Sequence, residues 1–147
     1  MTQKLFCFGY GYTADHLVQA LRASDPGWTV AGTTRDIEKQ ELMDQHHIES
    51  YIFRTDEPLI DPVNALTGTT HLLISTPADD FGDPTFRLHY HDILNIPTLT
   101  WVGYLSTTGV YGDRNGDWVN ENSRVAPTTK RGVRRARAEE QWLDLHR

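Results

Sequence analysis

The sequence has 147 residues, 38% of them hydrophobic, which predicts a single domain over residues 1–147 with a real core. The 14 Lys and Arg against 20 Asp and Glu give a formal net charge of −6, which argues against nucleic-acid binding. No apolar run is long enough to span a membrane, no leader pattern precedes the first apolar run, and a single cysteine, Cys7, excludes a disulfide framework. We therefore expect a cytoplasmic protein.

An apolar run at residues 5–8 leads directly into a glycine turn and then into a periodic segment. The run does not alternate with polar residues, which is typical of a strand buried on both faces of a parallel sheet. After the turn, apolar residues fall at helical spacing: Ala14, Leu17, Val18 and Leu21. The order of strand, glycine turn and helix is the context in which G-x-G-x-x-A indicates dinucleotide binding.

The turn itself reads Gly9-Tyr10-Gly11-Tyr12-Thr13-Ala14. Gly9 permits the tight turn, Gly11 leaves the backbone open to a pyrophosphate, and Ala14 lets the helix pack close to the strand. The first N–H groups of the helix, around Tyr12 and Thr13, then face the phosphate charge. The alternative is an ordinary strand-to-helix turn that contains two glycines.

A second strand is predicted at residues 28–32, and it runs into Thr33, Thr34 and Arg35. NAD-binding proteins usually place an acid here for the ribose hydroxyls, whereas an arginine suits a 2′-phosphate. Arg35, with the Thr34 hydroxyl, therefore favours NADP over NAD as the cofactor. Two alternatives stay open: Arg35 is a solvated side chain at a helix start, or Asp36 is the ribose-binding acid.

The chain continues with a helix at residues 37–45, a third strand at residues 49–53, a short helix at residues 59–66 and a fourth strand at residues 71–75. Asp56 follows the third strand and either accepts a hydrogen bond from an adenine amino group or caps a turn. Ser75, Thr76 and Pro77 follow the fourth strand, and we expect them in the cleft near the nicotinamide, because ligands bind beyond the carboxyl ends of parallel strands.

A helix at residues 85–95, a fifth strand at residues 99–105 and a last helix from about residue 127 to 145 complete the pattern. Strands that alternate with helices predict an α/β fold with a doubly wound parallel sheet, the Rossmann fold. The histidine pairs His46-His47 and His89/His91 do not share a helix face, so we expect no metal site.

The segment that follows the fifth strand carries a more specific motif, Tyr104-Leu105-Ser106-Thr107-Thr108-Gly109-Val110-Tyr111-Gly112, with Glu121 and Pro127 after it. Together with the glycine turn, it resembles the extended short-chain dehydrogenase/reductase superfamily. These NAD(P)-dependent epimerases, dehydratases and reductases often act on nucleotide sugars. The resemblance covers nearly the whole chain.

In that superfamily a Ser or Thr follows the fifth strand, and a Tyr-x-x-x-Lys motif lies on the next helix, where the Tyr is the general acid/base. These positions match Thr107, Arg131 and Arg135 in this sequence. Arginine is always protonated, so Arg131 cannot shuttle a proton as tyrosine does. The sequence therefore looks like an atypical branch, related to nucleotide-sugar epimerases, from which the Tyr is missing.

Arg131, Arg134 and Arg135 share a helix face, and the resemblance implies that this face points into the cleft, where with Lys130 it would clamp phosphates. The alternative is a solvated basic face partnered by Glu139 and Glu140.

Members of the superfamily continue into a sixth strand and a C-terminal lobe that supplies most of the substrate pocket. The resemblance therefore implies that this chain is the N-terminal Rossmann part only, with the fifth strand at an open edge, and that the protein forms homodimers. Three functions follow as hypotheses: an NADP-dependent enzyme acting on a nucleotide sugar, a non-catalytic NADP(H)-binding regulatory module, and a structural remnant.

Overall fold

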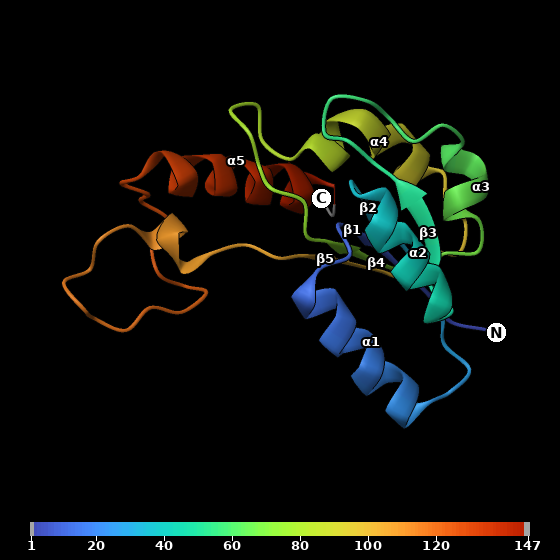
Figure 1. Ribbon diagram of the computed structural model, residues 1–147. Coiled ribbons are helices and arrows are strands. Elements are labelled where there is room, and N and C mark those ends of the chain that lie inside the picture. Colours follow the sequence, from blue (N-terminus) through green and yellow to red (C-terminus); the bar gives the residue numbers. More distant parts are fainter. Residues whose placement is uncertain (1, 146–147) are drawn as a thin grey trace.

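Five parallel strands form one sheet in residues 2–145, the part of the chain that the computed structural model describes. The strand order is β3-β2-β1-β4-β5. In chain order, the elements are β1 (Lys4–Phe8), α1 (Tyr12–Ser24), β2 (Thr29–Thr34), α2 (Ile37–Gln45), β3 (Glu49–Ile52), α3 (Pro62–Leu66), β4 (His71–Ile74), α4 (Pro84–Leu94), β5 (Trp101–Tyr104), the 3₁₀ turn η1 (Thr108–Tyr111) and α5 (Lys130–Asp144). Figure 1 shows the sheet with its helices and the segment between η1 and α5, which loops away from the sheet.

The central strand β1 is buried on both faces, and its alternating side chains enter two separate cores. Phe6 and Phe8 pack in one core, to which α3, α4 and α5 contribute. Leu5 and Cys7 pack in the other, with residues of α1 and α2. Helices therefore cover both faces of the sheet, and the predicted doubly wound α/β fold is confirmed.

Register between the strands places the ends of β1 and β4 at the same level. Phe8 is paired with Ile74, and the N–H of Ser75 donates to the Phe8 carbonyl at 2.8 Å. The glycine turn after β1 and the residues after β4 therefore lie side by side at the carboxyl edge of the sheet. Strand β5 lies at the open edge, as expected.

Most element boundaries differ by one or two residues from the sequence prediction, and three of the differences are informative. The short helix starts at Pro62 rather than at residue 59, because Asp61 caps it by accepting from the Asn64 N–H. The last helix starts at Lys130, where Thr129 is its cap. The strand predicted at residues 99–105 spans Trp101–Tyr104, and Thr100 and Leu105 on either side of it donate to the Thr70 and Ile74 carbonyls.

None of the helices in residues 2–145 combines the length and the apolar composition that crossing a bilayer requires.

Candidate functional site

A cavity of about 340 Å³ lies at the carboxyl ends of the central strands. Four segments contribute to its wall, each from the end of a strand or the residues that follow it: Gly9, Tyr10 and Gly11; Thr33, Thr34, Arg35, Asp36 and Lys39; Phe53 and Thr55; Ser75, Thr76 and Pro77. In parallel α/β sheets, ligands bind in this position. Seven of the residues predicted to hold a cofactor line it together: Gly9, Gly11, Thr34, Arg35, Ser75, Thr76 and Pro77.

A larger cavity of about 540 Å³ lies between β5 and α5. Its wall is mainly apolar, with Trp101, Val102 and Trp142 among its residues, and it includes neither glycine of the turn. We take the smaller cavity as the candidate site, since it joins the glycine turn to several polar and charged side chains.

Glycine occupies the two positions of the turn for different structural reasons. Gly9 has φ +83°, and a Cβ at this position would lie 3.2 Å from the backbone carbon of Ser75. Gly11 has φ −117° and ψ −164°, an extended conformation open to any residue, and a Cβ there would meet no protein atom within 4 Å. Gly9 is therefore required by the fold, whereas Gly11 leaves open space at the wall of the cavity.

Thr33 at the end of β2 holds the glycine turn in place. Its hydroxyl oxygen accepts from the Gly9 N–H at 2.8 Å, and its carbonyl accepts from the Tyr10 N–H at 2.8 Å. The Thr33 side chain is fully buried. Thr33 was not among the predicted site residues. The signal that could have found it is its position as a polar residue directly after the predicted second strand.

Replacing Thr33 with valine should destabilise the protein by about 1–2 kcal/mol, because the nearly isosteric side chain leaves the Gly9 N–H without its acceptor. Urea unfolding measures this change. Thr69→Val is the matched control: Thr69 is also fully buried, and its hydroxyl finds no hydrogen-bond partner among residues 2–145. Equal destabilisation by both variants would contradict the role assigned to Thr33.

Charge at the cavity comes from β2 and the start of α2. Arg35 is exposed, and Lys39, one turn into α2, donates to the Tyr10 carbonyl. Asp36 caps α2, where its carboxylate accepts from the Glu38 N–H at 2.9 Å. The acid considered as a ribose ligand is thus engaged in the helix cap, while two cations line the same wall. Lys39 was not among the predicted residues, because nothing in the sequence showed that its side chain turns back to the glycine turn.

The remaining predicted cofactor residues do not line this cavity. Ala14 is fully buried beneath the turn, which agrees with the close helix packing expected of it. Tyr12 and Thr13 are exposed in the first turn of α1. Asp56 is exposed as well, and its neighbour Thr55 takes the place in the cavity wall that was expected for Asp56.

The three residues at the family's catalytic positions lie beyond the end of β5. Thr107 caps η1, where its hydroxyl accepts from the Gly109 N–H at 3.2 Å. Arg135 donates to the Tyr104 hydroxyl at 3.0 Å and to the Leu105 carbonyl at 2.7 Å. Arg131 is exposed in the first turn of α5. Helix α5 packs closely on η1, since a Cβ on Gly132 would lie 2.6 Å from the Gly109 carbonyl oxygen.

The basic start of α5 does not act as one cleft-facing cluster. Arg134 and Lys130 form ion pairs with Asp80, at 2.7 and 3.4 Å, and Asp80 was not considered as their partner in the sequence analysis. The Arg134 guanidinium beside Asp80 holds the pKa of that carboxyl below its usual value. The expectation that Arg134 joins Arg131 and Arg135 as a phosphate clamp was therefore wrong.

Comparison with known proteins places this geometry among Rossmann-like structures. No family model matches the chain, and no curated protein is similar to it at a significant level. Among solved structures, a conserved protein of unknown function from Silicibacter pomeroyi is 40% identical, with a TM-score of 0.83 over 98% of this chain and 49% of its own.

Two further solved structures are more distant in sequence. UDP-glucuronic acid 4-epimerase from Bacillus cereus, in complex with UDP-glucuronic acid and NAD, is 17% identical, with a TM-score of 0.72 over 98% of this chain and 52% of its own. A short-chain dehydrogenase/reductase superfamily protein from Agrobacterium tumefaciens with bound NAD is 16% identical, with a TM-score of 0.70 over 99% of this chain and 45% of its own. The chain has the fold of these proteins. It spans about half the length of each.

Proposed function

We propose that this chain binds NADP(H) in the 340 Å³ cavity and provides the cofactor-binding half of an epimerase, dehydratase or reductase. The observation that carries the proposal is the open space at Gly11, where a side chain would meet no protein atom within 4 Å although the glycine lines the cavity. Such a gap lets backbone N–H groups at the start of α1 approach a diphosphate. Two of the solved structures with this fold contain bound NAD.

The residues of the cavity fit this cofactor. Gly9 shapes the turn, Gly11 and the first turn of α1 would hold the diphosphate, and Arg35 with Lys39 would hold a 2′-phosphate. Ser75 and Thr76 would line the nicotinamide side. The cavity wall has two cations and one carboxylate, and that carboxylate caps α2, so the charge at this wall suits a ligand with an additional phosphate.

The proposed substrate is a nucleotide sugar or a similar compound with a hydroxyl or carbonyl group. When bound, the cofactor supplies hydride transfer. Thr107 accepts a hydrogen bond from Gly109, which leaves its own O–H to donate to a substrate oxygen. Arg131 is a permanent cation, so it would stabilise negative charge on that oxygen and would not carry the proton. A different base must then move the proton.

The test of this proposal is a panel of nucleotide sugars with NADP(H). Nicotinamide absorbance detects a reductase, and chromatography of the sugars detects an epimerase or dehydratase, whose net reaction regenerates the cofactor. We expect turnover that falls at least about tenfold in Thr107→Ala, because a hydrogen bond to the reacting oxygen is lost. NADP affinity should stay within about twofold, since Thr107 does not line the cavity.

A non-catalytic NADP(H)-binding regulatory module is the second candidate, and Arg131 at the position of the general acid/base favours it. The outcome that supports this candidate is tight NADP binding by calorimetry with neither an absorbance change nor a chemically altered sugar in the panel. Thr107→Ala should then be indistinguishable from the natural chain.

A further inference from the structure

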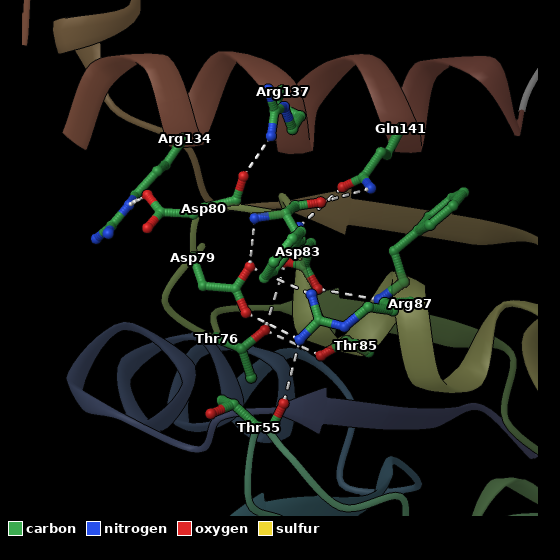
Figure 2. Close-up of polar contacts among 12 residues, drawn as sticks. Thr55, Thr76, Asp79, Asp80, Asp83, Thr85, Arg87, Arg134, Arg137 and Gln141 are labelled. Atoms are coloured by element: carbon green, nitrogen blue, oxygen red, sulfur yellow. Dashed lines mark hydrogen bonds and ion pairs between the residues drawn. The ribbon is translucent and has the colours of Figure 1, made fainter. Parts of the chain in front are cut away.

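Helix α5 has a stripe of polar side chains that all contact one turn of the chain, residues 79–83. The members follow one another at spacings of four, three and four residues, which places them on one face of the helix: Lys130, Arg134, Arg137 and Gln141. Figure 2 shows the labelled members of this stripe reaching from the helix toward the turn.

Asp80 receives most of these contacts. Its carboxylate pairs with Arg134 at 2.7 Å and with Lys130 at 3.4 Å, and its carbonyl accepts from Arg137. Further along the helix, Gln141 accepts from the Asp83 N–H at 2.8 Å and donates to the Phe81 carbonyl at 3.2 Å. The stripe is thus fixed along about three helical turns, and Asp80 holds three of its four members.

The turn is closed by internal hydrogen bonds and approaches α5 closely. Asp79 and Gly82 exchange backbone hydrogen bonds of 2.8 and 3.2 Å, and the Asp79 carboxylate accepts from the Phe81 N–H at 2.8 Å. Gly82 has φ +102°, and a Cβ there would lie 2.1 Å from the Gln141 side-chain oxygen. Glycine is therefore required at this contact.

On its other side, the turn is tied to the candidate cofactor cavity (Figure 2). Arg87 of α4 binds both carboxylate oxygens of Asp79, at 2.9 and 3.2 Å, and reaches the Thr55 carbonyl at 3.4 Å. Thr55 lines the cavity, and so does Thr76 just before the turn. Asp83 at the end of the turn is buried, and its carboxylate accepts from the Phe86 N–H at 3.1 Å and from Thr76 at 3.4 Å.

A second stripe of α5 consists of the residues that directly follow the members of the first stripe in the sequence: Arg131, Arg135, Ala138 and Trp142. Ala138 and Trp142 are buried, but both belong to the second half of the helix. In the first half, Gly132 is buried against η1, and Arg135 donates to Tyr104 and Leu105, so these contacts hold one face of the helix. The polar contacts with Asp80 constrain the neighbouring face. The rotation of α5 decides where Arg131 and Arg135 point.

We propose that Asp80 is a positioning residue: by holding Lys130, Arg134 and Arg137, it sets the rotation of the first half of α5 relative to the cofactor cavity. Exposed ion pairs contribute little to global stability, so the loss of Asp80 should change the local order of α5 much more than the unfolding transition.

Hydrogen exchange of the full chain tests the proposal without any ligand. In Asp80→Asn, amides of residues 131–137 should exchange at least about fivefold faster, while the unfolding midpoint stays within about 4 °C. Asp80→Glu keeps the charge and should restore at least half of the protection. Glu140→Gln removes one charge from the exposed side of the same helix and should leave the exchange unchanged. Exchange in Asp80→Asn equal to that of the natural chain would overturn the proposal.

Ligand binding gives a second test, which rests on the proposed function. It distinguishes a change in the position of α5 from a general loss of order in the protein. The probe 2′,5′-ADP carries only the adenosine half of NADP. Its affinity should stay within about twofold in Asp80→Asn, while that for NADP falls at least about fivefold. An equal loss for both probes would contradict positioning toward the nicotinamide side. Binding of neither probe by the natural chain would reject the proposed function, and the exchange experiment would still decide the role of Asp80.

Discussion

Replacing Gly11 with serine is expected to weaken NADP binding by at least about a hundredfold and to leave the protein as stable as before. Gly11 lines the cavity and a Cβ there meets no protein atom within 4 Å, so the new side chain would occupy the space proposed for the diphosphate. A hundredfold loss corresponds to about 2.7 kcal/mol. Calorimetric titration with NADP measures it.

Stability should not fall in this variant, because Gly11 is the N-cap residue of α1 and makes no side-chain cap bond. Serine is among the preferred residues at this position, so the change should be neutral or slightly stabilising. Gly9→Ala is the contrasting variant. Its positive φ and its contact with Ser75 should destabilise the fold by about 1–3 kcal/mol whether or not a ligand is present. Unchanged NADP affinity in a folded Gly11→Ser protein would show that the diphosphate does not bind at this turn.

Replacing Arg35 with alanine should lower NADP affinity by about 10- to 150-fold and NAD affinity by no more than about threefold. The loss of one charge-assisted hydrogen bond costs roughly 1.5–3 kcal/mol, and NAD lacks the 2′-phosphate that would receive it. Arg35 is exposed at the wall of the cavity, so its removal should not disturb the core.

Arg54→Ala is the matched control for this prediction, since Arg54 is also exposed just beyond a strand but does not line the cavity. It should change the affinities for NADP and NAD by the same small factor. If Arg35→Ala weakens both dinucleotides equally, Arg35 does not distinguish them. If it weakens neither, the 2′-phosphate is bound elsewhere, and Lys39 is the next residue to replace.

Much of the fold was predictable because the signals that define it are local. The apolar run of β1, the two glycines and the helical spacing of α1 all lie within residues 4–24, and the predicted helix at residues 37–45 has the bounds of α2. Boundaries were less accurate where a cap decides them. Asp61 and Thr129 shorten the predicted helices by accepting from N–H groups three residues on.

The site was predictable only where residues directly follow strands. The turn at Gly9–Gly11, Arg35 and residues 75–77 meet at one cavity because parallel strands end at one edge of the sheet. Contacts between distant segments carry no such local signal. The partner of Arg134 is Asp80, 54 residues earlier in the chain, and Thr33 supports Gly9 from the next strand. The phosphate-clamp hypothesis failed for Arg134 because only the folded chain brings Asp80 to α5.

The most direct measurement of the central claim is amide NMR of the full chain during titration with NADP. If backbone N–H groups at the glycine turn hold the diphosphate, the largest shift changes should fall on Gly11, Tyr12 and Thr13, with a smaller set at Arg35. Inorganic pyrophosphate should move the first set but not Arg35. Saturating NADP that leaves these amides unmoved, or moves only amides of α5, would contradict the account.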